Sequence, residues 1–271
     1  SVVYAPLPVA QWQGIDASWS SSQTQSEYQS NVEKIKEKIA AGDIYQVNLC
    51  RVLSTKSKQP LQGLANRLQQ DNPAPFASYL RLPNLEVASA SPELFLKRDG
   101  AIIKSTPIKG TSKTDNFGEK DRAENVMIVD LVRNDLSRVA AKGTVQVEEL
   151  FGVYPFKNVN QMISTVTCKT RPETSNWDIL KATFPMGSMT GAPKISAMEL
   201  AERYEKTERG IYSGALGYVK PNGDFDFNVV IRSLLYNRKT QYLSCAVGSA
   251  ITIGANAEDE YQECLLKAEK L

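Results

Sequence analysis

Two pairs of acidic residues in this sequence have the spacing of neighbours on one helical face. Asp121 and Glu124 lie in one stretch with helical periodicity, and Glu260 and Glu263 lie in another near the C-terminal end. Taken alone, each pair is most simply a solvated acidic face, and Lys267, four residues after Glu263, favours that interpretation. Taken together, four carboxylates on two helices could surround one Mg²⁺, which prefers oxygen ligands and retains several waters.

A lysine at position 109 interrupts the apolar and hydroxylated stretch STPIKGT, residues 105–111. Such a lysine is either the solvated end of a strand or a desolvated amine, and a desolvated amine has a lowered pKa and is a nucleophile at neutral pH. The sequence contains no histidine, which excludes Ser-His-Asp catalysis, HExxH hydrolases and the usual transition-metal sites. Acid–base chemistry must therefore come from carboxylates, lysine, tyrosine or cysteine.

Two stretches of small residues could bind an anion. PMGSMTGAPK (185–194) precedes a predicted helix, but it lacks P-loop spacing, and a tight turn explains its glycines equally well. CAVGSAI (245–251) lies in a predicted strand and is either a ligand-approach site or a bulge. Arg232, inside the apolar run NVVIRSLL, needs an anionic partner, which is either a structural carboxylate or a substrate. Tyr212 is most simply a half-buried aromatic residue with a satisfied hydroxyl.

The composition is that of a globular protein, because 42% of the 271 residues are hydrophobic and 23% are charged. The net charge of +2 predicts no strong attraction to nucleic acid or to membrane surfaces. The four cysteines show no C-x-x-C spacing, so neither a zinc knuckle nor a disulfide framework is indicated. No apolar run approaches a membrane span and no secretory pattern opens the chain, so we expect a reduced, cytoplasmic protein.

Hydrophobic periodicity predicts an α+β protein. Helices are predicted at 32–41, 60–70, 119–141, 176–184, 193–205 and from Asn256 onward. Strands are predicted at 44–54, 77–82, 85–91, 93–98, 101–108, 144–150, 162–170, 210–220, 225–237 and 241–253. Because many strands follow one another as hairpins, we expect antiparallel sheets and not a doubly wound nucleotide fold.

Eight stretches of the sequence resemble, in the same order, those of the chorismate-utilising enzymes. They are GDIYQVNL, SPELFL, PIKGT, AENVMIVDLVRNDLSRVA, GSMTGAPK, GIYSGAL, VVIRSL and DEYQECLLKAEKL. The resemblance covers nearly the whole chain from about residue 27. It implies an α/β/β/α sandwich with two antiparallel sheets, a single chorismate-binding catalytic domain over residues 1–271, and dependence on Mg²⁺.

Within this family, the lysine at position 109 resembles the branch that forms 4-amino-4-deoxychorismate for para-aminobenzoate and folate biosynthesis. Anthranilate, isochorismate and salicylate synthases typically have alanine there. The resemblance implies a transferase in which Lys109 attacks the ring and displaces the C4 hydroxyl, after which ammonia displaces Lys109. A partner subunit, a glutamine amidotransferase, would supply the ammonia. Anthranilate synthesis in the tryptophan branch and an inactive chorismate-binding module are the alternatives.

The resemblance also implies roles for single residues. Glu93 matches the general acid that protonates the departing hydroxyl. Glu124 and Glu263 match direct Mg²⁺ ligands, and Asp121 and Glu260 match ligands that act through water. The positions that match substrate-binding residues are Gln46, Gly110, Thr111, Thr190, Tyr212, Arg232, Gly248, Ser249 and Lys267.

Four positions bear on which activity the chain has. Gln46 stands where isochorismate and salicylate synthases have a water-activating lysine, which counts against those activities. Gln161 stands where the family usually has a histidine, so an amide must do whatever that histidine does. Ser249 and Ala250 add bulk to a turn that often has more glycine. The chain also begins close to the start of the family's catalytic region, so we expect that it lacks the family's N-terminal segment.

Overall fold

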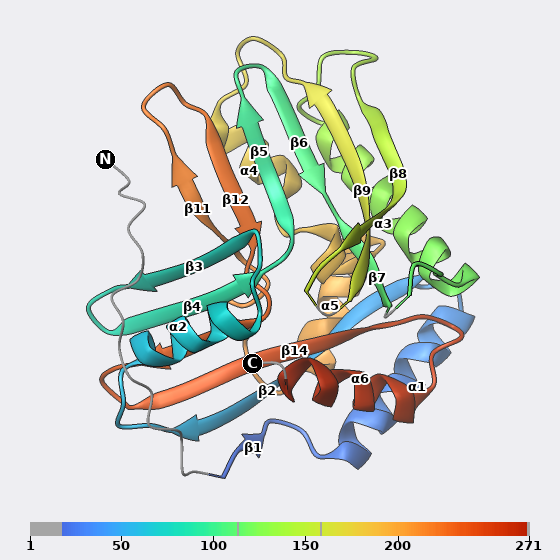
Figure 1. The fold of residues 1–271 in the computed structure, drawn as a ribbon. Helices are drawn as coiled ribbons and strands as arrows, with labels where there is room; N and C mark the ends of the chain where they lie inside the picture. Colours follow the sequence, from blue (N-terminus) through green and yellow to red (C-terminus); the bar gives the residue numbers. More distant parts are fainter. Residues whose placement is uncertain (1–17, 113, 158, 270–271) are drawn as a thin grey trace.

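In the computed structural model, which describes residues 18–112, 114–157 and 159–269, the chain forms two antiparallel sheets flanked by helices (Figure 1). The first sheet has the order β1 (Ser20–Ser21), β2 (Gln46–Lys56), β14 (Tyr242–Ile251), β13 (Ser233–Asn237), β4 (Leu85–Ser91) and β3 (Phe76–Arg81), with β10 (Gly191–Ala192) also paired to β2. The second has the order β11 (Ala215–Val219), β12 (Phe225–Val229), β5 (Leu94–Asp99), β6 (Ile102–Thr106), β9 (Asn160–Lys169) and β7 (Ile108–Ser112), with β8 (Gln146–Pro155) also paired to β9. The predicted α+β fold with two antiparallel sheets is therefore confirmed.

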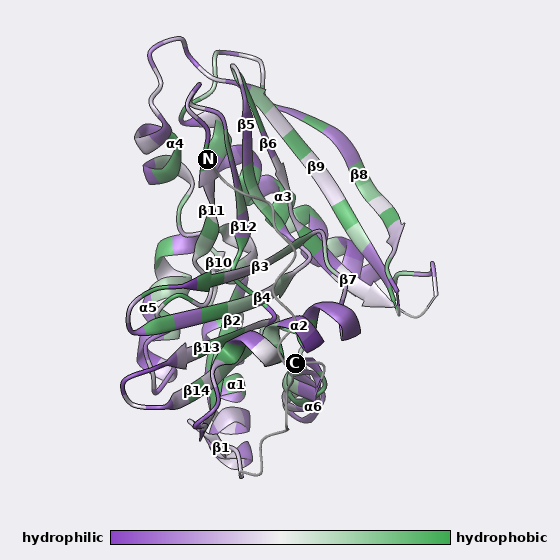
Figure 2. Ribbon diagram, turned by 60° about the vertical axis from the view of Figure 1, so that its left-hand side comes forward, coloured by the Kyte–Doolittle hydropathy of each residue, from purple (hydrophilic) through white to green (hydrophobic). Residues whose placement is uncertain are grey.

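Alternate residues of the strands form apolar sheet faces, and the helices pack on these faces. The helices are α1 (Gln25–Ala40), α2 (Leu61–Asp71), α3 (Glu119–Ser137), α4 (Asn176–Thr183), α5 (Lys194–Tyr204) and α6 (Ala257–Glu269), with a 3₁₀ turn at Gly187–Met189. Val47 and Leu49 of β2 and Val247 of β14 pack against α1, α5 and α6. In Figure 2, β8 and β9 alternate between hydrophobic and hydrophilic residues along their length. No helix in the described ranges is both long enough and apolar enough to cross a membrane.

Two short connections carry the chain from one sheet to the other. The connection between β4 and β5 contains Glu93, and the connection between β12 and β13 contains Arg232. Backbone hydrogen bonds join them, because Val229 N donates to Glu93 O at 3.0 Å and Ala90 N donates to Arg232 O at 3.0 Å. The two crossovers therefore form one hydrogen-bonded unit at the junction of the sheets.

Three predicted strands differ from the structure. The single strand predicted over 225–237 is wrong, because β12 and β13 belong to different sheets. A continuous apolar run indicates burial but does not specify which sheet each half joins. The strand predicted over 101–108 is divided at Pro107, which has no backbone N–H to donate to the sheet. Residues 210–213 form a turn, so Tyr212 precedes β11 and does not lie on a strand.

Candidate active site

A cavity of about 420 Å³ lies where β7 and β9 of the second sheet approach β2 and β14 of the first. Side chains of α3 and α6 also line it. The structure brings most of the predicted site residues into its wall, although they come from distant parts of the chain. These are Glu93, Lys109, Gly110, Thr111, Asp121, Glu124, Tyr212, Arg232, Gly248, Glu260, Glu263 and Lys267.

Three predicted residues, Gln46, Thr190 and Ser249, are not among those that line the cavity. The Thr190 hydroxyl donates to the carbonyl oxygen of Met186 at 3.1 Å. The Ser249 hydroxyl donates to the carboxylate of Glu260. Gln46 is buried at the start of β2, and its Oε1 has no hydrogen-bond partner among the residues that the structure describes. The structure therefore does not bring these three side chains into the cavity wall.

Lys109 lies on β7, with its amine directed into the cavity environment. Next to it, Gly110 has a φ of +90°, and a Cβ at that position would come within 2.9 Å of the Phe117 ring. Within the described ranges, no carboxylate forms an ion pair with Lys109. Burial lowers the pKa of Lys109, against the opposing influence of the Glu124 carboxylate. A larger fraction of this amine is therefore neutral and nucleophilic than of a solvated lysine.

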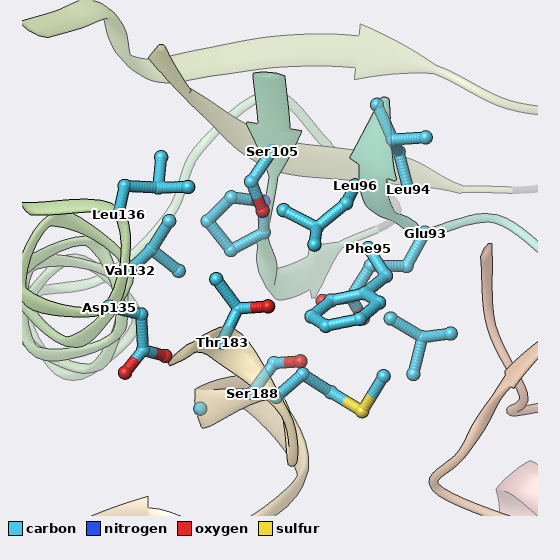
Figure 3. Close-up of a pocket in the computed structure, with 14 residues that line it drawn as sticks. Glu93, Leu94, Phe95, Leu96, Ser105, Val132, Asp135, Leu136, Thr183 and Ser188 are labelled. Carbon is cyan, nitrogen blue, oxygen red and sulfur yellow. The ribbon is translucent and has the colours of Figure 1, made fainter. Parts of the chain in front are cut away.

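Glu93 lies in the crossover between β4 and β5 and is only 4% exposed. Burial raises the pKa of Glu93 to about 7, although a hydrogen bond from Ser188 and the charge of Lys109 oppose the shift. Figure 3 shows Glu93 and Ser188 at the edge of a second, mostly apolar cavity of about 20 Å³, which has room for one water molecule. A carboxyl with a pKa near 7 is suited to donate a proton at neutral pH.

Glu260 is a buried member of the second acidic pair, with an exposure of 2%. Its carboxylate accepts a hydrogen bond from Ser249 and forms an ion pair with Lys120 at 3.1 Å. Sequence reasoning missed Lys120, although its position directly before Asp121 on α3 was a usable signal. This lysine neutralises part of the acidic cluster in the absence of a ligand.

Glu263 of the same pair forms an ion pair with Lys267 at 2.5 Å on α6. Burial favours the neutral acid, but the Lys267 ammonium outweighs it and lowers the pKa of Glu263. Lys267 also donates to the carbonyl oxygen of Gly248 at 2.8 Å. A Cβ on Gly248 would come within 2.5 Å of Oδ1 of Asn48, so a larger residue there would displace the Asn48 side chain. Asn48 was not predicted as a site residue, yet it lines the cavity beside Gly248.

The carboxylates of Asp121, Glu124, Glu260 and Glu263 could together hold a magnesium ion. All four line the cavity, and their oxygen donors are the kind that Mg²⁺ prefers. Burial raises the pKa of Glu124, and repulsion from Glu260 and Glu263 acts in the same direction, which a divalent cation would relieve. Within the described ranges, no three acidic or cysteine side chains lie close enough together to hold a metal ion as they stand, so the fit to Mg²⁺ rests on the oxygen donors alone.

Arg232 and Tyr212 form another part of the wall. Arg232 has a φ of +48°, in the left-handed region, and no ion pair with any described carboxylate. Burial lowers the pKa of Arg232, and the charge of Glu93 opposes this. The hydroxyl of Tyr212 accepts a hydrogen bond from the Cys50 thiol at 3.8 Å. A partly buried guanidinium without an internal partner is suited to bind an anionic ligand.

Comparisons with known proteins support one family. The family described as chorismate binding enzyme matches residues 5–271. Aminodeoxychorismate synthase component 1 of Escherichia coli is 38% identical over 95% of this chain and 59% of its own length. Anthranilate synthase component 1 of Aquifex aeolicus is 35% identical over 93% of this chain and 53% of its own length.

A solved structure agrees with the sequence matches. The crystal structure of anthranilate synthase component I from Streptococcus pneumoniae superposes with a TM-score of 0.86 and 30% identity, covering 93% of this chain and 59% of that one. The chain thus spans little more than half the length of these relatives. Nearly all of the chain is matched by the family, in sequence and in fold. This chain therefore belongs to the chorismate binding enzyme family.

Proposed function

We propose that this chain, acting as one catalytic domain, converts chorismate and ammonia to 4-amino-4-deoxychorismate through a covalent intermediate on Lys109. The observation that carries the proposal is the combination of Lys109 and Glu93 in one cavity. The amine has a lowered pKa and no ion-pair partner among the described residues, and the carboxyl has a pKa of about 7. Together they offer a nucleophile and a proton donor in one cavity.

The first displacement needs both groups. The neutral amine of Lys109 forms a bond to a ring carbon, the ring double bond shifts, and the C–O bond at C4 breaks. Glu93 gives its proton to the departing hydroxyl, which leaves as water and not as the poorer leaving group hydroxide. The lysine nitrogen carries an extra proton after attack. Transfer of that proton to the Glu93 carboxylate restores the neutral acid and leaves a neutral secondary amine.

The second displacement releases the product. Ammonia forms a bond to C4, the double bond shifts back, and the bond between the ring and Lys109 breaks. The departing lysine nitrogen takes back a proton, which balances the proton lost by the new amine. Covalent catalysis in this way divides one difficult substitution into two easier ones. A partner subunit that hydrolyses glutamine would deliver the ammonia.

The other cavity residues bind and orient the substrate. Arg232 supplies an unpaired guanidinium for a substrate carboxylate, and Tyr212 lies beside it in the cavity wall. Lys267 can exchange its contact with Glu263 for a substrate carboxylate, because both partners reach the cavity. Magnesium, when bound by Asp121, Glu124, Glu260 and Glu263, would supply positive charge that anchors a carboxylate and draws electron density from the ring.

Product identification tests this proposal. Purified protein is incubated with chorismate, Mg²⁺ and ammonium, and the products are separated by chromatography and identified by mass spectrometry. We expect 4-amino-4-deoxychorismate from the wild type and its near loss in Lys109→Ala. Lys104→Ala is the matched control, because Lys104 lies on the neighbouring strand β6 and does not line the cavity.

Two other outcomes would overturn the assignment. Anthranilate as the product would assign the chain to the activity named for its Aquifex aeolicus relative. Chorismate binding without any product would favour an inactive binding module. A covalent adduct on Lys109, found by digestion and mass spectrometry of the acid-quenched protein, would support the nucleophile independently of product release.

A further inference from the structure

Gln161 is a buried polar residue of the cavity wall that the proposed chemistry has not used. It lies on β9, is 1% exposed, and lines the same cavity as Lys109. Its Oε1 has no hydrogen-bond partner among the described residues. A buried carbonyl oxygen without a donor destabilises the folded protein, and at the cavity wall the unpaired Oε1 can accept a hydrogen bond from a ligand.

The register of the second sheet brings Gln161 close to the nucleophile. Its Cα is paired with that of Thr111 on β7, two residues from Lys109, which lies in a register shift between Ile108 and Thr111. The next side chain, Met162, points to the opposite face, since its Cε lies 3.2 Å from the position of a Cβ on Gly110. Gln161 therefore reaches the cavity from the strand adjacent to the one that carries Lys109.

Few hydrogen-bond donors are available during the reaction to pair with Gln161 Oε1. The substrate carboxylates carry no hydrogen-bond donor, and the C4 hydroxyl leaves in the first displacement. During the second displacement, the donors next to the ring are therefore the N–H groups of the incoming ammonia and of the lysine adduct. Ammonia gains positive charge as it bonds to C4, and a preoriented carbonyl dipole stabilises charge that develops in this way.

Gln161 is uncharged, and this affects whether the bound nitrogen is ammonia or ammonium. Carboxylates near this site would favour ammonium, which has no lone pair for attack, over ammonia. Two of them are already paired, Glu260 with Lys120 and Glu263 with Lys267. An amide oxygen accepts a hydrogen bond from ammonia without favouring protonation as strongly as a carboxylate does. Gln161 thus offers an acceptor that leaves the ammonia nucleophilic.

We propose that Gln161 Oε1, unpaired in the cavity wall beside Lys109, is the acceptor that positions ammonia for attack on the lysine-bound intermediate. This inference rests on the proposed function and extends it to the second displacement. Gln161 would then determine specificity for the amine nucleophile. The affinity for chorismate would not depend on Gln161.

The test compares Gln161→Met with Gln146→Met, an exposed glutamine on β8 that does not line the cavity. Steady-state rates are measured against ammonium at saturating chorismate, and chorismate affinity is measured by calorimetry. We expect the KM for ammonium to rise about tenfold in Gln161→Met, the loss of one hydrogen bond. Chorismate affinity changes less than threefold, and the control resembles the wild type.

Two further measurements separate this role from a structural one. The Lys109 adduct accumulates in Gln161→Met after an acid quench, because the second displacement is slowed and the first is not. The melting temperature of Gln161→Met is equal to or higher than that of the wild type, since the substitution removes an unpaired buried acceptor. Gln161→Glu shifts the rate profile to higher pH, because a carboxylate favours ammonium.

The outcomes that overturn the inference are distinct from those that overturn the proposed function. If the wild type makes no 4-amino-4-deoxychorismate from chorismate and ammonium, both proposals fail. If the wild type makes it and Gln161→Met keeps the wild-type KM for ammonium, only the role of Gln161 fails. An equal loss of chorismate and ammonium affinity, or a lowered melting temperature, would likewise assign Gln161 to general support of the cavity.

Discussion

The two walls of the cavity treat their polar groups in opposite ways. On the wall formed by the second sheet and the crossovers, Lys109, Arg232 and the Gln161 carbonyl have no ion-pair or hydrogen-bond partner for their side chains among the described residues. On the wall formed by α6 and β14, Glu260 and Glu263 are each paired with a lysine. The difference indicates that the polar side chains of the first wall can bind ligand groups directly. On the second wall, a ligand must replace an existing ion-pair partner.

The same contrast is visible in the two lysines. Burial lowers the pKa of Lys109, whereas Lys267 has a carboxylate at 2.5 Å and a carbonyl oxygen at 2.8 Å. The Lys267 ammonium binds an anion already, the Glu263 carboxylate, and a substrate carboxylate could take its place. An unpaired and desolvated ammonium loses its proton more easily and is suited to attack a ring carbon. The neighbours of Lys109 and Lys267 thus give these two lysines of one cavity different proposed roles.

The largest expected effect on catalysis comes from replacing Glu93. Glu93→Gln keeps the size of the side chain but cannot donate a proton as an acid. We expect kcat to fall by roughly 10²- to 10⁴-fold, the usual contribution of general acid catalysis. The measurement is the initial rate of product formation with ammonium as the nitrogen source. A rate within about threefold of the wild type would remove Glu93 from the mechanism.

The same variant should be more stable than the wild type at alkaline pH. The pKa of Glu93 is raised from 4.5 to about 7, so its stabilising contribution is fully present below about pH 4.5 and is lost as pH rises through 7. The loss amounts to roughly 3 kcal/mol in the free energy of unfolding. Urea denaturation at acidic and alkaline pH should show this loss in the wild type and not in Glu93→Gln.

Magnesium binding should stabilise the protein through the acidic cluster. At a Mg²⁺ concentration about 100 times the Kd, the free energy of unfolding rises by about 2.7 kcal/mol. Glu124→Gln should abolish most of this gain, because Glu124 feels the repulsion of two other carboxylates. Thermal melts with Mg²⁺ and with a chelator measure the effect without substrate. An undiminished gain in Glu124→Gln would place the metal elsewhere.

Arg232→Met should separate binding from stability on the unpaired wall. Chorismate affinity is expected to fall roughly 10- to 100-fold, the value of a hydrogen bond to a charged group. The melting temperature is expected to stay the same or rise, because a desolvated cation without a described ion-pair partner is removed. Calorimetric titration and thermal melts check both results. A strongly lowered melting temperature would instead indicate a structural arginine.

The smallest effect is expected on the paired wall. Lys120→Met removes an ion pair whose lysine side chain is 56% exposed, so solvent already screens it. We expect a change in the free energy of unfolding of less than about 1 kcal/mol. Denaturation of Lys120→Met beside Arg232→Met gives the direct comparison. A large loss in Lys120→Met would mean that Glu260 depends on this lysine, and the contrast between the walls would weaken.

Local patterns were sufficient to predict much of the fold. The period of the apolar residues predicted α3 and α6, and turn residues predicted the hairpin between β5 and β6. The sequence could not indicate that the run 225–237 serves two sheets, because both halves are equally apolar. The predicted class of fold was correct although this strand was wrong.

The sequence predicted most of the residues that line the cavity, but it did not predict the contacts between them. Gly248 was predicted beside the substrate, but its close approach to Asn48, which lies on a strand 200 residues away in sequence, was not. The bond from Ser249 to Glu260 likewise depends on how α6 packs against β14. Such contacts arise from tertiary packing, which residue spacing does not encode. Lys120 differs from these, because its position directly before Asp121 was a usable signal, although its ion pair with Glu260 depends on the packing of α3 beside α6.

The paired crossovers have a mechanical consequence. They are the two short connections between the sheets and are hydrogen-bonded to each other, so a rocking of one sheet against the other would pivot there. Points on a pivot move least, and this pivot carries Glu93 and Arg232. Breathing of the cavity would therefore displace Lys109 and α6 while leaving the acid and the guanidinium nearly stationary. Such a pivot admits and releases ligands without losing the alignment of the groups that lie on it.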